Sequence, residues 1–252
     1  EPQEVFAGSH RMVTVLCRNE AEETVRGDLH IRLYQLSSAT AAPFDSSFWK
    51  SLEVLPGQTV IETVRLTLPS VRAETRFLLQ WLEGTNKVLG ATELVVYPAD
   101  LLKELRKIAG GQPVGVYDPQ NQLKPLLKSV DCEFYDLEHS EVAAFSGKLA
   151  IVGPFAFVAR IGEGLDKLVR TLAWKGVGVV WFQPSSKPGS RRKPSFFSVP
   201  EGKSTVVVAQ AELTVDLAER PGSQLNLLQL AQEALNPAPL ALPNFAAQPQ
   251  RK

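Results

Sequence analysis

The sequence GLDKLVRTLAWKGVGVVWF, residues 164–182, decides the fold of the second half of the chain. Apolar residues recur every three or four positions in its first part, which predicts an amphipathic helix ended by Gly176. The run from Val177 to Phe182 is apolar on both faces, and such a run predicts a fully buried strand. A helix followed by a buried strand is typical of a parallel sheet covered by helices on both sides.

The same alternation extends over residues 99–235. Further strands are predicted at 113–117, 132–137, 149–152 and 205–209, with helices at 101–109, 119–130 and 225–235 and a short helix or turn at 142–145. The sequence therefore predicts an α/β domain with a doubly wound parallel sheet, flavodoxin-like or Rossmann-like, over residues 99–235. The Pro/Ala-rich residues 236–252 predict an extended or disordered tail.

Before Pro98 the hydrophobic period is two. Strands are predicted at 12–16, 28–36, 48–54, 60–68, 76–83 and 88–97, the last with a possible break at Gly90, and residues 37–47 as a polar loop. This spacing predicts an antiparallel, immunoglobulin-like β-sandwich over residues 1–98. Trp49 and Trp81 lie inside these strands, so they are candidate core anchors, with a sugar-stacking platform as the alternative.

Length and charge limit the classes of function. A chain of 252 residues is long enough for two domains. Its 27 Lys and Arg balance 27 Asp and Glu, which argues against nucleic acid as the partner. No apolar run reaches the roughly 18 residues that cross a bilayer, so no membrane span is expected. The chain begins Glu1-Pro2 without an initiator Met, which suggests a processed or excised piece of a larger, periplasmic or secreted protein, with the cytoplasm still open.

Cysteine and histidine are scarce. Cys17 and Cys132 lie in apolar strand sequences and are interpreted as small buried hydrophobes. No CxxC, HExxH or paired-histidine spacing occurs, so no metal site is predicted.

Motifs for cofactors and nucleophiles are also missing. The turn after the first strand of the α/β half, residues 117–120, contains no glycine to admit a pyrophosphate, and Gly162 and Gly164 lack the third glycine of a dinucleotide fingerprint. There is no P-loop and no GxSxG elbow. The sequence predicts no cofactor and no catalytic residue.

Ligands of open α/β sheets bind beyond the carboxyl ends of the strands. The candidate ligand-binding residues there are Tyr117, Asp118, Asp136, Phe155 and Gln183. Asp118 is interpreted as a helix cap and Asp136 as a solvated strand end, with an acid/base pair of the two carboxylates as the alternative. His139, beside Glu138, is an alternative general base.

A basic loop is the other candidate site. Four cations lie within seven residues among Pro, Gly and Ser, at Lys187, Arg191, Arg192 and Lys193. The loop either grips an acidic partner or is a flexible, solvated excursion, and no aromatic is interleaved with its charges.

The turn Leu55-Pro56-Gly57-Gln58, the ending Leu68-Pro69 and the segment LVVYP at 94–98 resemble the immunoglobulin-like linker domains of glycoside hydrolase family two. The α/β half resembles the glutamine-amidotransferase-like fold, non-catalytic copies of which accompany β-galactosidase barrels. That family pairs an elbow cysteine with a downstream His-x-Glu, whereas Cys132 stands at a strand start and no histidine follows His139.

The resemblance implies a degenerate, non-catalytic copy that serves docking, oligomerisation or ligand contact, with a protein partner or self-association expected and carbohydrate possible. Two hypotheses follow. The first is a non-catalytic structural or interaction module of a larger exported protein. The second is a small-molecule (sugar or phosphate) binding protein or weak hydrolase that uses the carboxyl edge of the α/β sheet.

Overall fold

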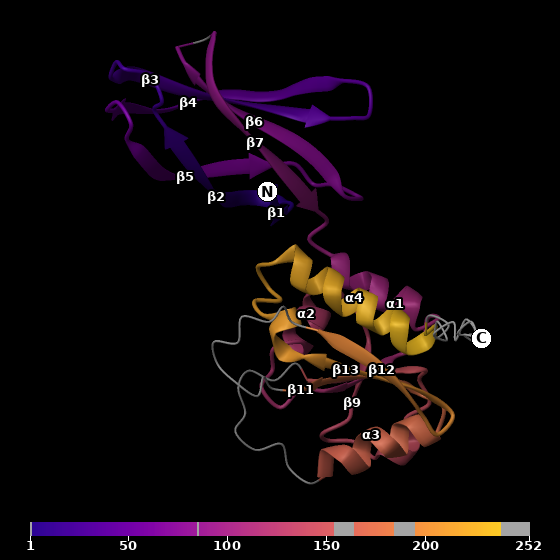
Figure 1. Ribbon diagram of the computed structural model, residues 1–252. Helices are drawn as coiled ribbons and strands as arrows, with labels where there is room; N and C mark the ends of the chain where they lie inside the picture. Colours follow the sequence, from indigo (N-terminus) through magenta and orange to yellow (C-terminus); the bar gives the residue numbers. More distant parts are fainter. Residues whose placement is uncertain (1, 85, 154–163, 184–194, 238–252) are drawn as a thin grey trace, which may run out of the picture. The chain divides into compact units, whose positions relative to one another are not determined.

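A computed structural model describes residues 2–84, 86–153, 164–183 and 195–237. The chain forms two compact units, the first of residues 1–101 with 216–225 and the second of residues 102–215 with 226–252 (Figure 1). The first is built of β-sheets and the second of helices and a mostly parallel sheet. The protein is therefore of mixed β and α/β class. The predicted tail at 238–252 lies outside the described residues.

The first unit contains two sheets. The larger has the order β1 (Gln3–Phe6), β7 (Lys87–Tyr97), β6 (Thr75–Glu83), β3 (Val25–Leu36) and β4 (Ala41–Val54). The smaller pairs β2 (Gly8–Arg18) with β5 (Thr59–Leu68) in antiparallel register. In Figure 1 the two sheets lie on opposite sides of the unit.

Alternation along the strands builds one core between these sheets. Every second residue points inward, and the buried set is Val13, Val15, Ile31, Leu33, Val64, Leu66, Leu68, Phe77, Leu79, Trp81, Leu94 and Val96. The prediction of a core anchor is confirmed for Trp81. Trp49 is half-buried and packs on Trp81 with 4.8 Å between ring centroids.

Two segments of the first unit differ from the sequence-based expectation. Residues 41–47 were expected in a loop but begin β4, because the antiparallel ladder with β3 continues as far as the pair Leu36–Ala41. Their side chains are exposed, so no alternating pattern marks the strand. The polar strand β1 was not predicted either, and it pairs in parallel with β7.

β7 is continuous at Gly90. Trp81 pairs with Gly90 and Leu82 with Val88, so Leu89 is an extra residue that bulges from the ladder. The expected break is wrong, because a bulge absorbs the irregularity without ending the strand. The expected turn at 55–58 is confirmed, with Gly57 at a φ of 70° and a Gln58 N–H donated to the Leu55 carbonyl.

The second unit has a six-stranded sheet of order β12-β13-β11-β10-β8-β9. The strands are β8 (Val114–Tyr117), β9 (Phe134–Asp136), β10 (Leu149–Val152), β11 (Gly178–Gln183), β12 (Phe196–Glu201) and β13 (Ser204–Gln210). All neighbours are parallel except β12, which runs antiparallel to β13.

Helices cover both faces of this sheet. Figure 1 shows α1 (Glu104–Ile108) and α4 (Pro221–Leu235) on one face and α3 (Gly164–Trp174) on the other. Short 3-10 turns precede α1 (Leu101–Lys103), follow β9 (Val142–Ala144) and follow β13 (Ala211–Thr214). Buried β10 and β11 confirm the prediction made from their continuous apolar sequences.

Three predictions for the second unit are corrected. The helix expected at Pro119 begins only at Lys124 as α2 (Lys124–Ser129), because residues 119–123 form turns and Asn121 has a φ of 52°. The strand expected from Cys132 is shorter and starts at Phe134. β12 was missed because it lies at the edge of the sheet and exposes residues on both faces.

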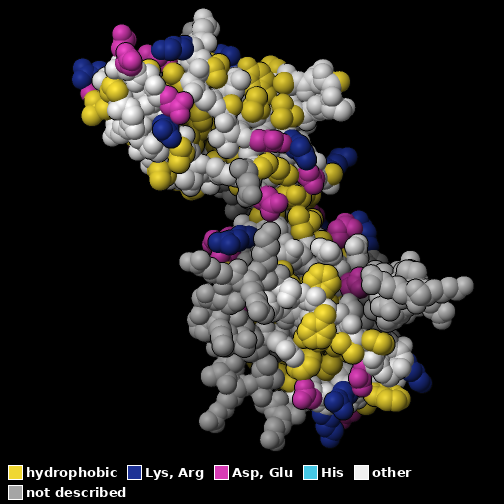
Figure 2. Space-filling model, in the orientation of Figure 1, with side chains coloured by type: hydrophobic (Ala, Val, Ile, Leu, Met, Phe, Trp, Pro, Cys, Tyr) yellow, Lys and Arg dark blue, Asp and Glu magenta, His cyan; other side chains and the backbone are white. Residues whose placement is uncertain are grey.

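Among the described helices, none is long and apolar enough to cross a membrane. On the face shown in Figure 2, the described Lys and Arg side chains lie interspersed with Asp and Glu. This distribution agrees with the balanced charge of the sequence.

Candidate functional site

The carboxyl edge of β8 and β9 gathers a cluster of charged residues. Because the two strands are parallel neighbours, Asp118, which follows β8, and Asp136, which ends β9, lie at the same edge. Glu138 joins them: it accepts a hydrogen bond from the Asp118 N–H at 2.8 Å and donates its own N–H to Asp136 Oδ1 at 3.0 Å. We call Asp118, Lys124, Asp136, Glu138 and His139 the edge cluster.

Asp118 organises the backbone of the next turn. Its carboxylate is fully buried and accepts the N–H groups of Gln122, Leu123 and Lys124 at 3.1, 2.7 and 3.0 Å. The last two of these are donors that the start of α2 would otherwise leave unsatisfied. The prediction that Asp118 is the N-cap of a helix starting at Pro119 is wrong: the N-cap position of α2 is Leu123, and Asp118 binds the N–H groups at the start of this helix from the preceding turn.

Lys124 supplies the positive charge of the edge cluster. Its ammonium group, almost entirely buried, contacts both Glu138 Oε1 and, at 3.0 Å, Asp136 Oδ1. Burial alone would lower the pKa of Lys124, but the hydrogen bonds and negative charges of Glu138 and Asp136 outweigh it and raise the pKa. Lys124 thus stays charged well above neutral pH.

Asp136 is held ionised by the same contacts. Burial acts to raise the pKa of its carboxyl, but hydrogen bonds from the Glu138 N–H, Lys124 and His139, with the charge of Lys124, lower that pKa from 3.8 to about 2. His139 lies 3.1 Å from Asp136 Oδ2, and its side chain is 78% exposed. A general base for neutral pH needs a pKa near 7, so Asp136 is poorly placed for that role.

Sequence reasoning found the carboxylates but missed Lys124. It lies between Leu123 and Leu126 of an apolar helical stripe, where a lysine is expected to point into solvent. Only the fold brings the lysine beneath two carboxylates that lie 12 and 14 residues further on. Within the described residues there is no group of three or more His, Cys, Asp or Glu able to hold a metal ion.

Two of the other predicted site residues, Tyr117 and Gln183, are described by the structure. Tyr117 ends β8 and lines a cavity of about 340 Å³ with Leu137 and the α3 residues Gly164, Leu165 and Leu168. Gln183 ends β11, which β10 separates from β8, so it lies apart from the edge cluster. Phe155 and the basic loop of Lys187, Arg191, Arg192 and Lys193 fall outside the described residues.

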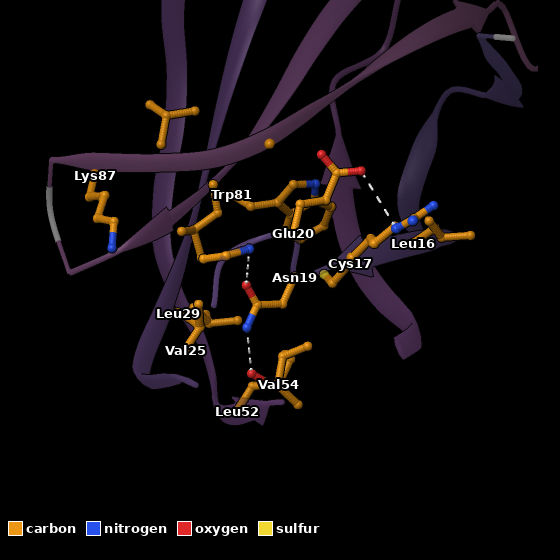
Figure 3. Close-up of a pocket in the computed structure, with 15 residues that line it drawn as sticks. Leu16, Cys17, Asn19, Glu20, Val25, Leu29, Leu52, Val54, Trp81 and Lys87 are labelled. Carbon is orange, nitrogen blue, oxygen red and sulfur yellow. Dashed lines mark hydrogen bonds and ion pairs between the residues drawn. The ribbon is translucent and has the colours of Figure 1, made fainter. Parts of the chain in front are cut away.

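A second concavity lies in the first unit, at one end of the two sheets (Figure 3). Its volume is about 340 Å³. We call it the sandwich-end pocket, lined by Leu16, Cys17, Arg18, Asn19, Glu20, Ala21, Val25, Leu29, Leu52, Val54, Trp81, Lys87, Val88, Leu89 and Gly90. Five strands of both sheets contribute to it, together with the loop after β2.

The polar groups of the sandwich-end pocket are occupied by internal contacts. Asn19 is buried, donates its side-chain amide to the carbonyls of Glu23 and Val54, and accepts the Ala21 N–H. Figure 3 shows two of these bonds, with the Arg18–Glu20 ion pair above them. Lys87 pairs with Glu83 at 2.7 Å. The other lining side chains, apart from the Cys17 thiol, are apolar.

Cys17 is the half-buried thiol on this wall. Burial, followed by the nearby charge of Glu62, raises the pKa of the thiol, although Lys50 opposes the shift. The side chain therefore behaves as a soft apolar group at neutral pH. No motif marks this pocket, because its lining comes from separate strands and each residue fits an ordinary sandwich core.

Comparisons with known proteins assign the chain to no family. No family model matches the chain, and no curated protein matches it. Among solved structures, an alkylpurine DNA glycosylase from Pseudomonas fluorescens, crystallised on DNA with an abasic-site analogue, is similar over 38% of this chain and 28% of its own, with 12% identity and a TM-score of 0.29.

Two other similar structures are longer enzymes. A β-glucosidase from Listeria innocua matches 38% of this chain and 15% of its own, with 16% identity and a TM-score of 0.27. A β-glucuronidase from Bacteroides uniformis matches 70% of this chain and 26% of its own, with 10% identity and a TM-score of 0.26. The chain spans only a minor part of each of these proteins, and TM-scores this low support no assignment of function.

Proposed function

We propose that the chain is a non-catalytic structural and interaction module. The observation that carries this proposal is the internal use of the described charges after β8 and β9, at the edge where α/β enzymes place their chemistry. Asp118 is saturated by three backbone N–H groups, and Lys124 is buried between Asp136 and Glu138. Such an arrangement fixes a loop and leaves little capacity for proton transfer to a substrate.

An exposed strand edge supports the interaction role. β12 is the outermost strand of its sheet, and the side chain of Phe197 is 58% exposed. Phe196 and Val199 on the same strand are also exposed. An apolar edge strand is a ready template for association with another chain, so we propose a protein partner or self-association.

The finer folds are part of the proposal. Numbered along the chain, the five parallel strands lie in the order 2-1-3-4-5, which is a common order of doubly wound, flavodoxin-like domains. This order supports a flavodoxin-like second unit. One core shared by two facing sheets supports an immunoglobulin-like first unit. The resemblance of both halves to accessory regions of carbohydrate-processing proteins supports a place in a larger exported protein.

A second candidate function rests on the cavity beside Tyr117. It opens near the carboxyl end of β8 against the start of α3, where ligands of such sheets bind. Binding of a sugar or phosphate there is the alternative to a purely structural role.

Turnover assays test the proposal directly. The full chain should hydrolyse none of a panel of nitrophenyl glycosides, phosphate esters and carboxyl esters above the buffer rate. Turnover that is lost in Asp136→Asn would overturn the non-catalytic assignment. Calorimetry with glucose and with inorganic phosphate tests the alternative, since binding that disappears in Tyr117→Ala would favour a ligand site at the sheet edge.

Light scattering tests the interaction role. An assembly that grows with protein concentration, and that Phe197→Ser weakens, would support self-association through β12. A chain that remains monomeric at all concentrations and in the Phe197→Ser variant alike would contradict it.

A further inference from the structure

The sandwich-end pocket carries an inference that is independent of the proposed function. Its walls come from both sheets of the first unit, with Leu29, Leu52, Val54, Leu89 and Gly90 from the larger sheet and Leu16 and Cys17 from the smaller. A volume of about 340 Å³ is within the roughly 300–1,000 Å³ range of small-molecule sites. It is about twice the roughly 150 Å³ of a cavity that holds benzene.

Apolar side chains surround the mouth of this pocket. Leu16 is 63% exposed, Val88 51% and Leu89 40%, and all three line it. The bulge leaves one of them, Leu89, outside the regular ladder. Apolar surface at the rim of a concavity is stabilised when a ligand removes it from water, at about 25 cal/mol per Å².

The inside of the pocket favours a neutral ligand. The Asn19 side chain is already bonded to three backbone groups. The charged rim residues Arg18 and Lys87 are paired with Glu20 and Glu83. A ligand with buried polar atoms would lose hydrogen bonds to water and would find these side chains already paired.

Trp81, a core residue that is 3% exposed, reaches the wall at one edge of its ring. Gly90 stands opposite Trp81, and a Cβ added to Gly90 would lie 3.4 Å from Cδ1 of the indole and meet no other atom within 4 Å. The glycine therefore leaves one edge of the indole uncovered by a side chain from β7. The thiol of Cys17 lies on the same wall, and both indole and sulfur pack well against aromatic rings.

We propose that the sandwich-end pocket binds a neutral aromatic molecule of about two rings. Trp81 and Cys17 contact its rings, and Leu16, Val88 and Leu89 close over it at the mouth. Acyl chains and anionic aromatics are the competing ligand classes, and the test separates them.

The probe is N-phenyl-1-naphthylamine, a neutral two-ring aromatic with a third ring attached, titrated into the full-length chain. Binding should raise and blue-shift its fluorescence and quench tryptophan emission. Leu89→Ser should weaken binding about fivefold, because it removes apolar contact at the mouth without disturbing a buried residue. Gly90→Val should weaken it at least tenfold, because the new methyl groups occupy the space beside Trp81.

Ile61→Ser is the matched control. Ile61 is 68% exposed on the same unit but does not line the pocket, so binding should stay within twofold of the wild type. Circular dichroism and urea unfolding of each variant confirm that the fold is kept. Equal effects of Leu89→Ser and Ile61→Ser, or no binding to the wild-type chain, would overturn the proposal.

Cys17 supplies a second readout. At alkaline pH a maleimide should label Cys17 and spare Cys132, which is buried, and the probe should slow that labelling. Cys17→Ser should abolish the labelling. Displacement of the probe by palmitate at lower concentrations than by neutral naphthalene derivatives would assign the pocket to acyl chains and refute the aromatic class. Preferential binding of anilinonaphthalene sulfonate would refute the neutral class.

Discussion

The edge cluster of the second unit and the sandwich-end pocket of the first are opposites. The edge cluster is rich in charge, but the protein itself binds these charges. Three N–H groups bind Asp118, and two carboxylates bind Lys124. In the sandwich-end pocket the polar side chains of Asn19, Arg18 and Lys87 are paired within the protein, yet the pocket has open volume and exposed apolar residues at its mouth. A cluster of charged residues is therefore a poor indicator of a ligand-binding site in this protein.

The difference has a physical reason. Charged groups removed from water need partners, so a buried cluster is stable only when its contacts are complete. Complete contacts leave nothing for a substrate. An apolar wall has no such requirement, and it can stay partly exposed to water at a modest cost in free energy.

The largest effect should come from removing the central charge of the edge cluster. Lys124→Met keeps the aliphatic stem but leaves Asp136 and Glu138 without their cation, and should lower the free energy of unfolding by about 3–5 kcal/mol. Urea unfolding measures the loss, and hydrogen exchange should place it at β8 and β9. Lys128→Met on the same helix is the control, because Lys128 is exposed. A loss as small as that of the control would show that the cluster is not structural.

Asn19→Ala tests the pocket by the same measure. It removes one hydrogen bond that ties the loop after β2 to β4 and two hydrogen bonds within that loop, and should cost about 2 kcal/mol. Hydrogen exchange should rise in residues 19–25. Glu22→Ala in the same exposed loop should change little. If Asn19→Ala leaves the free energy of unfolding unchanged, the pocket wall is held by packing alone.

The edge cluster should also affect how the free energy of unfolding falls at acid pH. The pKa of Asp136 in the folded protein, about 2, lies below its ordinary 3.8, so the ionised carboxylate stabilises the fold above about pH 4. This contribution, about 2 kcal/mol, should disappear as the pH falls from 4 towards 2. Urea midpoints measured across that range should fall more steeply in the wild type than in Asp136→Asn. Parallel curves would contradict the assigned pKa.

The smallest effect on stability should come from the mouth of the pocket. Leu89→Ser replaces a partly exposed side chain at a bulge and should change the free energy of unfolding by less than about 1 kcal/mol. The same substitution should weaken probe binding. A large loss of stability would mean that Leu89 belongs to the core, and the contrast between an open pocket and a closed cluster would weaken.

Much of the fold was predictable because it follows local patterns. The alternation of Val60–Leu68 and the apolar run of Val177–Phe182 each fix a strand, and the glycine stop at Gly176 has a φ of 87° in the structure. The edge strands β1 and β12 were missed because their sequences carry no alternating pattern. They become strands only by pairing with β7 and β13. The late start of α2 was missed because Asp118 binds its first N–H group from six residues away.

The sequence by itself determined the order of a β half and an α/β half, the change of period at Pro98 and the strand that buries each apolar run, because side-chain periodicity is a local property. The tertiary structure alone decided that Lys124 lies under Asp136 and Glu138, and that Cys17, Trp81 and Gly90 face one cavity. These groups are distant along the chain, and only strand pairing and sheet packing bring them within contact distance.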